Sequence, residues 1–125
     1  MIRALITVSV LLISLTASSA CRNADALAQG INGGDPANGR HLLYSYSCGS
    51  CHVIPGVTEA DGTIGPPLSG FGSRVYIAGL QENTPDNLSR WIAQPQEVQP
   101  GNAMPDLGVT RQQARDIAAY LYTLR

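Results

Sequence analysis

Two cysteines and a histidine, Cys48, Cys51 and His52, form the part of this sequence whose residue types and spacing most clearly predict chemistry. Their C-x-x-C-H spacing is typical of covalent haem attachment, in which each thiol adds to one vinyl group of a single porphyrin. The histidine that follows directly is then carried under the ring, where its imidazole can bind the iron. The motif therefore predicts one haem c per chain, with its iron as the reactive centre.

Three other sites can be built on a C-x-x-C pair, and each of them fits this sequence less well. A thioredoxin-like redox pair needs a βαβ context, which is not visible here. A zinc cluster needs four ligands, but the chain has only three cysteines and two histidines, and Cys21 lies in a leader region. A disulfide between Cys48 and Cys51 would close only a small ring. Covalent haem attachment is the favoured interpretation.

The candidates for the second axial ligand of the iron are Met104, His41, the Met1 that is discarded with the leader, or no residue at all. Met104 lies in an irregular stretch, residues 99–105, and belongs to no amphipathic stripe that would make it core filler. Prolines in that stretch hold the backbone still, as a ligand position requires. His41 lies on the first expected helix close to Cys48, where a solvated helix face is its ordinary role. We expect Met104 to bind the iron, with a bis-histidine iron as the minor alternative.

Coordination by His52 and Met104 would set both the potential and the reactivity of the iron. A thioether is a soft ligand that favours Fe(II), so it raises the reduction potential relative to a second imidazole. It also fills the sixth position, which leaves no place for oxygen or peroxide to bind. Such a centre passes single electrons, whereas an open sixth position would indicate a five-coordinate haem enzyme or a gas sensor.

Three helices are expected to position this centre. The first, residues 35–46, has aspartate as its N-cap and proline at its first helical position. The second, residues 84–95, begins with the same kind of pattern and ends at a proline. The third, residues 110–124, opens with a capping box between Thr110 and Gln113 and carries apolar residues at helical spacing.

Residues 53–79, between the first two helices, are rich in glycine and proline, which predicts little regular structure. A loop of this length is uncommon inside a small domain. A large, rigid, apolar ligand would account for the long loop, because the loop can wrap around the ligand. No segment alternates like a strand, so the chain is expected to be all-α.

The first part of the chain is expected to direct export. Residues 1–20 combine an early arginine, an apolar run and small residues, which is typical of a secretory signal peptide. Cys21 then resembles the lipidated first residue of a bacterial lipoprotein, and ordinary cleavage near Ala20 or after Ala28 is the alternative. We expect an exported, periplasmic protein, which is anchored to a membrane if Cys21 is lipidated.

The rest of the chain divides into a tether, residues 21–34, and one folded domain, residues 35–125. All eight basic residues are arginine, and the formal net charge of the 125 residues is −1. Because nucleic-acid binding needs a clustered basic face, this balance argues against it.

These features together resemble the class I c-type cytochromes. The resemblance covers residues 35–125 and rests on four pieces in order. They are the C-x-x-C-H motif, Gly65-Pro66-Pro67-Leu68, Met104-Pro105 and a closing helix with Tyr120-Leu121. It implies an all-α cytochrome c fold, in which three main helices and long loops enclose one covalently bound haem.

The resemblance also implies roles for residues around the haem. The carbonyl of Pro66 would accept a hydrogen bond from the non-ligating nitrogen of His52. Arg74 would pair with a haem propionate. Trp91 would lie beside the methionine ligand, with its indole N–H near a propionate or the sulfur. Asn102 would brace the methionine loop.

Two more residues match the family where its first and last helices cross. Gly39 would allow the close approach, and Tyr120 would be the aromatic side chain packed on it.

The family's mitochondrial members dock through a ring of lysines, and this chain has none. The pattern is closer to bacterial cytochrome c domains, so the mitochondrial docking mode is not expected here.

The sequence therefore predicts a monomeric, single-haem carrier that is not itself an enzyme. It would pass single electrons between respiratory partners such as a terminal oxidase, a cytochrome bc-type complex or a dehydrogenase. One alternative is a haem-relay subunit of a larger oxidase or dehydrogenase complex. The other is the five-coordinate haem enzyme or sensor.

Overall fold

The structure, a computed structural model, describes residues 33–125. The predicted signal peptide, most of the predicted tether and Cys21 lie outside the described residues. Within them, no helix has both the length and the apolar character needed to span a bilayer.

Helix α3, Pro36–Ser45, forms where its N-cap predicts it. The Asp35 carboxylate accepts hydrogen bonds from the backbone N–H groups of Ala37 at 2.8 Å and Asn38 at 3.3 Å. Because proline at the first position has no N–H to satisfy, the start of the helix leaves few donors without partners.

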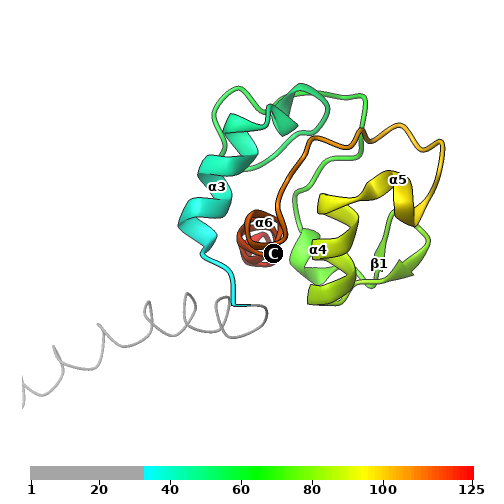
Figure 1. Cartoon of the computed structure of the whole chain (residues 1–125). Coiled ribbons are helices and arrows are strands. Elements are labelled where there is room, and N and C mark those ends of the chain that lie inside the picture. The colour runs from blue at the N-terminus through cyan, green and yellow to red at the C-terminus, as the bar shows by residue number, and fades with distance from the viewer. Residues whose placement is uncertain (1–32) are drawn as a thin grey trace, which may run out of the picture.

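Short elements follow α3, and two longer helices complete the fold (Figure 1). In chain order they are η1 (Cys48–Ser50), η2 (Phe71–Ser73), β1 (Tyr76–Ile77), β2 (Gln81–Glu82), α4 (Pro85–Ala93), α5 (Pro95–Val98) and α6 (Arg111–Thr123). Helix α6 opens with the capping box predicted between Thr110 and Gln113. The described chain is thus mainly helical, and the all-α prediction is confirmed.

Two elements depart from the sequence-based expectation. Strands β1 and β2 pair antiparallel over only two residues each, with Tyr76 opposite Glu82 and Ile77 opposite Gln81. Strands this short cannot display an alternating pattern, so nothing in the sequence indicates them. The second difference is Pro95, which was expected to end the second helix. Helix α4 already ends at Ala93, and Pro95 begins α5, because proline is well tolerated in a first helical turn.

Helix α6 is the centre of the fold, and Figure 1 shows it almost end-on with α3 and α4 on either side. The close crossing of α3 and α6 predicted from Gly39 is present. A Cβ atom added at Gly39 would overlap the carbonyl of Asp116 and would lie 3.0 Å from the backbone nitrogen of Ile117. Buried side chains from all the longer helices meet around α6.

A buried carboxylate fastens the start of α3 to α6. Asp116 is only 5% exposed, and it accepts hydrogen bonds from the backbone N–H of Asp35 at 2.9 Å and from the side-chain amides of Asn38 at 2.7 Å and Gln112 at 2.9 Å. A buried carboxylate with three donors is well satisfied. This network fixes the direction in which α3 leaves the crossing and runs toward the cysteines.

We expect Gly39→Val to destabilise the domain by about 2 kcal/mol or more, because overpacking at a backbone contact forces the two helices apart. The control is Ala37→Val on the exposed side of the same helix, which carries the same cost of a β-branched residue without the clash. Denaturant unfolding of the haem-loaded protein measures the difference. Equal stability of the two variants would show that the crossing does not depend on Gly39.

Candidate functional site

The attachment motif forms a single tight turn directly after α3. Ser47 takes a left-handed conformation (φ 54°) that ends the helix, and η1 begins at Cys48. The backbone N–H groups of Cys51 and His52 both donate to the carbonyl of Cys48, at 3.2 and 3.0 Å. The two thiols and the imidazole therefore arise from one turn of backbone, as attachment to a single ring requires.

Both thiols are free and half-buried. Burial raises the pKa of the Cys48 thiol above its ordinary value, so this group stays protonated at neutral pH. Because Cys48 and Cys51 are not joined, the structure gives no support to the disulfide interpretation. Within residues 33–125, no group of three or more His, Cys, Asp or Glu side chains is arranged to hold a metal ion.

The imidazole of His52 is held in one orientation. Its Nδ1 atom lies 2.8 Å from the carbonyl oxygen of Pro66. Since a carbonyl can only accept, Nδ1 carries the proton and Nε2 keeps a lone pair free for a metal. Gly65 packs against the same ring, because a Cβ atom there would collide with it and would lie 2.7 Å from Nδ1. The hydrogen bond expected from the sequence is therefore present.

The loop that carries Pro66 is folded back onto the motif by backbone hydrogen bonds. Gly65 donates to Cys51 at 2.8 Å, and Leu68 donates to Val53 at 2.8 Å. Tyr120 was expected to pack on Gly39. Its hydroxyl donates to the carbonyl of Pro55 at 2.7 Å and so ties this loop to α6.

Arg74 lies on the continuation of this loop. Its Nη2 atom donates to the carbonyl of Pro67 and, at 3.3 Å, to that of Ser69, while the guanidinium stacks 5.2 Å from the centre of the Phe71 ring. Neither of these bonds uses Nε or Nη1, so both of these nitrogen atoms remain able to donate to a carboxylate. Asn83 donates to the carbonyl of Arg74 at 3.0 Å, which fixes the backbone there.

Trp91 is half-buried on α4 and packs against the core. Among residues 33–125, no acceptor is within hydrogen-bond reach of its indole N–H. A half-buried indole ordinarily finds a partner, so this donor is available to a bound group. His41, the alternative iron ligand, is exposed on α3 with its Nε2 atom 3.4 Å from the Ser45 hydroxyl, as expected for a solvated histidine.

Met104 is half-buried in a braced loop between α5 and α6. Asn102 accepts a hydrogen bond from the backbone N–H of Met104 at 2.7 Å and donates to the carbonyls of Pro95 at 2.9 Å and Gln99 at 2.7 Å. The bracing role expected for Asn102 is therefore present. One side chain thus fastens the loop at three points.

A second brace, Gln96, was not predicted from the sequence. Its amide nitrogen donates to the carbonyls of Asn102 at 2.9 Å and Met104 at 2.7 Å, and its amide oxygen accepts from the backbone N–H of Gly101 at 3.0 Å. The one sequence feature that could have indicated this role is the position of Gln96, one residue after the proline that begins α5. From the sequence alone, however, Gln96 has no evident hydrogen-bond partner.

The residues present fit a covalently bound haem. The two thiols are unpaired, and the imidazole offers one unbonded nitrogen. Gly65 packs directly on the imidazole, where a larger side chain would collide with the ring. Ile64, next to this glycine, is 78% exposed, so it offers apolar surface that a porphyrin ring could cover.

Comparison with known proteins gives the site a family context. Residues 36–125 match the family described as Cytochrome c. The chain is 36% identical over 88 residues to cytochrome c oxidase subunit 2 of Alkalihalophilus pseudofirmus, which covers 70% of this chain and 25% of that protein. It is 34% identical over 68 residues to the same subunit of Bacillus subtilis, which covers 53% of this chain and 19% of that protein.

A smaller relative matches along nearly its whole length. Cytochrome c2 of Rhodopila globiformis is 35% identical over 106 residues, which covers 74% of this chain and 95% of that protein. By contrast, the chain spans only about a quarter of the length of the oxidase subunit from Alkalihalophilus.

Proposed function

Because the chain belongs to the cytochrome c family, we propose that it carries single electrons between membrane-associated respiratory partners. Its cofactor is haem c. The observation that carries the proposal is the hydrogen bond of 2.8 Å from His52 to Pro66, since it prepares one imidazole nitrogen for permanent metal ligation. No catalytic group besides the iron is required for this activity.

In this proposal the chain's own residues bind and orient the cofactor. Cys48 and Cys51 anchor it through thioether bonds, and His52 and Met104 are its axial ligands. When bound, the haem supplies an iron that alternates between Fe(III) and Fe(II). The two braces on the methionine loop keep the sulfur donor in place, so a small molecule does not easily take its position.

Spectroscopy and reduction test the carrier proposal. We expect a low-spin ferric protein with a weak near-infrared sulfur-to-iron band, which accepts one electron per chain. We also expect it to support oxygen consumption by a terminal oxidase to which it is added as electron donor. A high-spin ferric spectrum would instead favour the five-coordinate enzyme or sensor.

The similarity to oxidase subunits favours a second candidate, a haem-relay subunit within a larger complex. Gentle solubilisation and size-exclusion chromatography distinguish the two. A carrier elutes as a monomer, whereas a relay subunit co-elutes with an oxidase or dehydrogenase and loses its activity on separation.

We further propose that the protein is exported and that Cys21 anchors it to a membrane. The support is the pattern of residues 1–21 and the membrane-bound character of the proposed partners. Mass spectrometry of the mature protein reports the cleavage site, the added haem and any acyl chains together. A mature chain that begins after residue 21 would rule out the anchor.

We propose that Arg74 donates to a haem propionate and that the indole N–H of Trp91 lies near a propionate or the sulfur of Met104, because both side chains have N–H donors that the described residues leave unused. We expect Arg74→Gln to lower the reduction potential by on the order of tens of millivolts, since it removes a positive charge beside the iron centre. Arg40→Gln, which removes the same charge from the exposed face of α3, is the control. Equal potentials in the two variants would exclude the propionate contact.

Gln96→Leu is expected to loosen the methionine loop while leaving the helices intact. It removes three hydrogen bonds, each worth about 1 kcal/mol, so the near-infrared band should bleach at a lower temperature than in the unmodified protein. The matched control is Gln94→Leu, whose side chain bonds only to Glu97 on the surface. If both variants bleach at the same temperature, Gln96 does not hold the ligand loop.

A further inference from the structure

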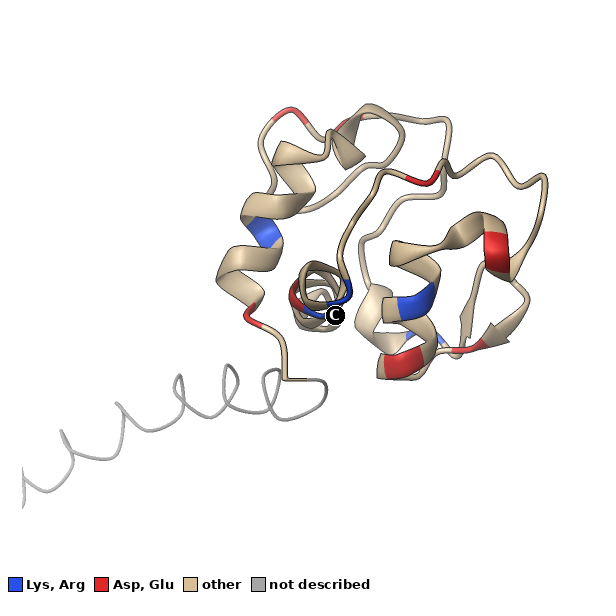
Figure 2. Ribbon diagram, in the orientation of Figure 1, with Lys and Arg blue, Asp and Glu red and all other residues tan. Residues whose placement is uncertain are grey.

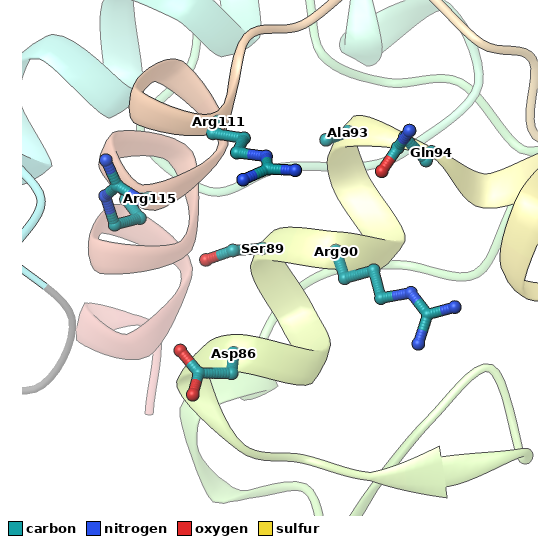
Figure 3. Close-up of a pocket in the computed structure, with 7 residues that line it drawn as sticks. All are labelled: Asp86, Ser89, Arg90, Ala93, Gln94, Arg111 and Arg115. Atoms are coloured by element: carbon teal, nitrogen blue, oxygen red, sulfur yellow. The ribbon is translucent and has the colours of Figure 1, made fainter.

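A pocket of about 300 Å³ lies between α4 and the start of α6, and it shares no lining residue with the proposed haem site. This volume is at the lower end of the range for small-molecule sites. Figure 3 shows the side chain of Arg111 extending into the space between the two helices, with the Ser89 hydroxyl pointing toward α6.

The pocket is strongly basic for this protein. Arg90, Arg111 and Arg115 line it against one acid, Asp86, which gives a local charge of +2 at neutral pH. These are half of the six arginines between residues 33 and 125. Elsewhere the charged residues are scattered over helices and loops (Figure 2). Such a concentration of positive charge attracts anions.

Several donors in the pocket have no partner. Among the described residues, the guanidinium groups of Arg90 and Arg111 make no hydrogen bond or ion pair. The Ser89 hydroxyl oxygen is fully buried and is the one buried side-chain oxygen or nitrogen in residues 33–125 without a hydrogen-bond partner. Burying a hydroxyl without a partner costs free energy, so an acceptor in the pocket would stabilise it.

The side chains that line the pocket supply its charged donors. Two backbone donors at the start of α6 are already engaged, because the Thr110 hydroxyl accepts from Gln113 at 3.3 Å and the Gln113 side chain accepts from Thr110 at 2.9 Å. Arg115 is fixed by two bonds to Gln112, at 3.1 and 2.7 Å. In Figure 3 Arg90 extends away from α6, whereas Arg111 extends into the space between the helices and the Ser89 hydroxyl points toward α6, so these two free donors face the pocket from opposite helices.

We propose that this pocket binds a phosphate group, held by Arg111 and Ser89 in the positive field of the neighbouring arginines. A phosphate is an anion in either source, so the positive charge of the pocket attracts it. It also has enough oxygens to face a planar guanidinium and a hydroxyl together. The phosphate belongs either to a free anion or to a lipid headgroup.

Inorganic phosphate tests the site in the full-length, haem-loaded protein. We expect phosphate at constant ionic strength to raise the melting temperature of the unmodified chain. Arg111→Gln should weaken phosphate binding about tenfold or more, as expected for a lost charged hydrogen bond. Arg125→Gln, which removes the same charge at the opposite end of α6, should change it less than about twofold. No stabilisation of the unmodified chain, or equal losses in the two variants, would overturn the proposal.

Ser89→Ala separates binding from folding. Without phosphate, this variant should be as stable as the unmodified protein or more stable, because it removes a buried hydroxyl that has no partner. Its affinity for phosphate should fall about threefold or more. Unchanged affinity would show that Ser89 faces no ligand and would refute the site as proposed.

Vesicles identify the source of the phosphate. If the ligand is a headgroup, Arg111→Gln should bind phosphatidylglycerol vesicles more weakly than Arg125→Gln does, and neither should differ on phosphatidylcholine. If the two variants bind both vesicles equally and differ only with inorganic phosphate, the ligand is a free anion. Both variants keep the proposed membrane anchor at Cys21, so its contribution to vesicle binding cancels in the comparison.

Discussion

Met104→Leu is expected to lower the reduction potential by on the order of 0.1 V or more and to remove the near-infrared sulfur-to-iron band. The thioether stabilises Fe(II) relative to Fe(III), and axial ligands are the protein's largest influence on haem potential. Leucine is close to methionine in volume, so the half-buried position is filled and the loop keeps its shape. Cyclic voltammetry and the ferric spectrum of the variant measure both effects.

His41→Gln is the matched test of the other candidate ligand. His41 is exposed, and its ring nitrogen lies 3.4 Å from the hydroxyl of Ser45 on its own helix, so this variant should leave the potential and the spectrum unchanged. If His41→Gln shifts the potential and Met104→Leu does not, the iron has two histidine ligands. Were neither variant to alter the spectrum, the sixth position would be open and the carrier proposal would fail.

The parts of the structure that the sequence predicted depend on local chemistry. The N-caps of α3 and α6 and the turn through the attachment motif involve residues within a few positions of one another. The bond from His52 to Pro66 spans 14 residues, and it was anticipated only through the family resemblance. That resemblance supplied the long-range information that spacing alone lacks.

The parts that were missed depend on the folded chain. Gln96 has no distinguishing pattern, and its role appears only when α5 brings its amide to the carbonyls of residues 102 and 104. Likewise, Ser89 is an ordinary helix residue until the fold buries its hydroxyl in the pocket between α4 and α6 without a partner. The hairpin of β1 and β2 is too short to register as a pattern. In each case the deciding contact is tertiary.

Cys48→Ala combined with Cys51→Ala is expected to have the largest effect on stability, because it removes both covalent links to the haem. The domain has a limited core, and residues 53–70 contain no regular element longer than a single bridge. Much of the order in that loop then depends on the apolar ring it wraps, and Ile64 beside the site stays exposed without one. We expect the colourless double variant to lose its cooperative melting transition.

Two matched variants show what the links contribute. Ser50→Ala changes a residue between the two cysteines. It removes an exposed hydroxyl that donates to the carbonyl of Ser47 at 2.8 Å and to the sulfur of Cys51 at 3.9 Å, but both thiols remain, so this variant should bind haem and melt cooperatively. Cys51→Ala alone keeps one thioether and should melt at an intermediate temperature. A colourless double variant that still melts in one sharp transition would mean that the helices around α6 suffice for folding. The haem would then bind to a domain that is already folded, and it would not be a required part of the folding core.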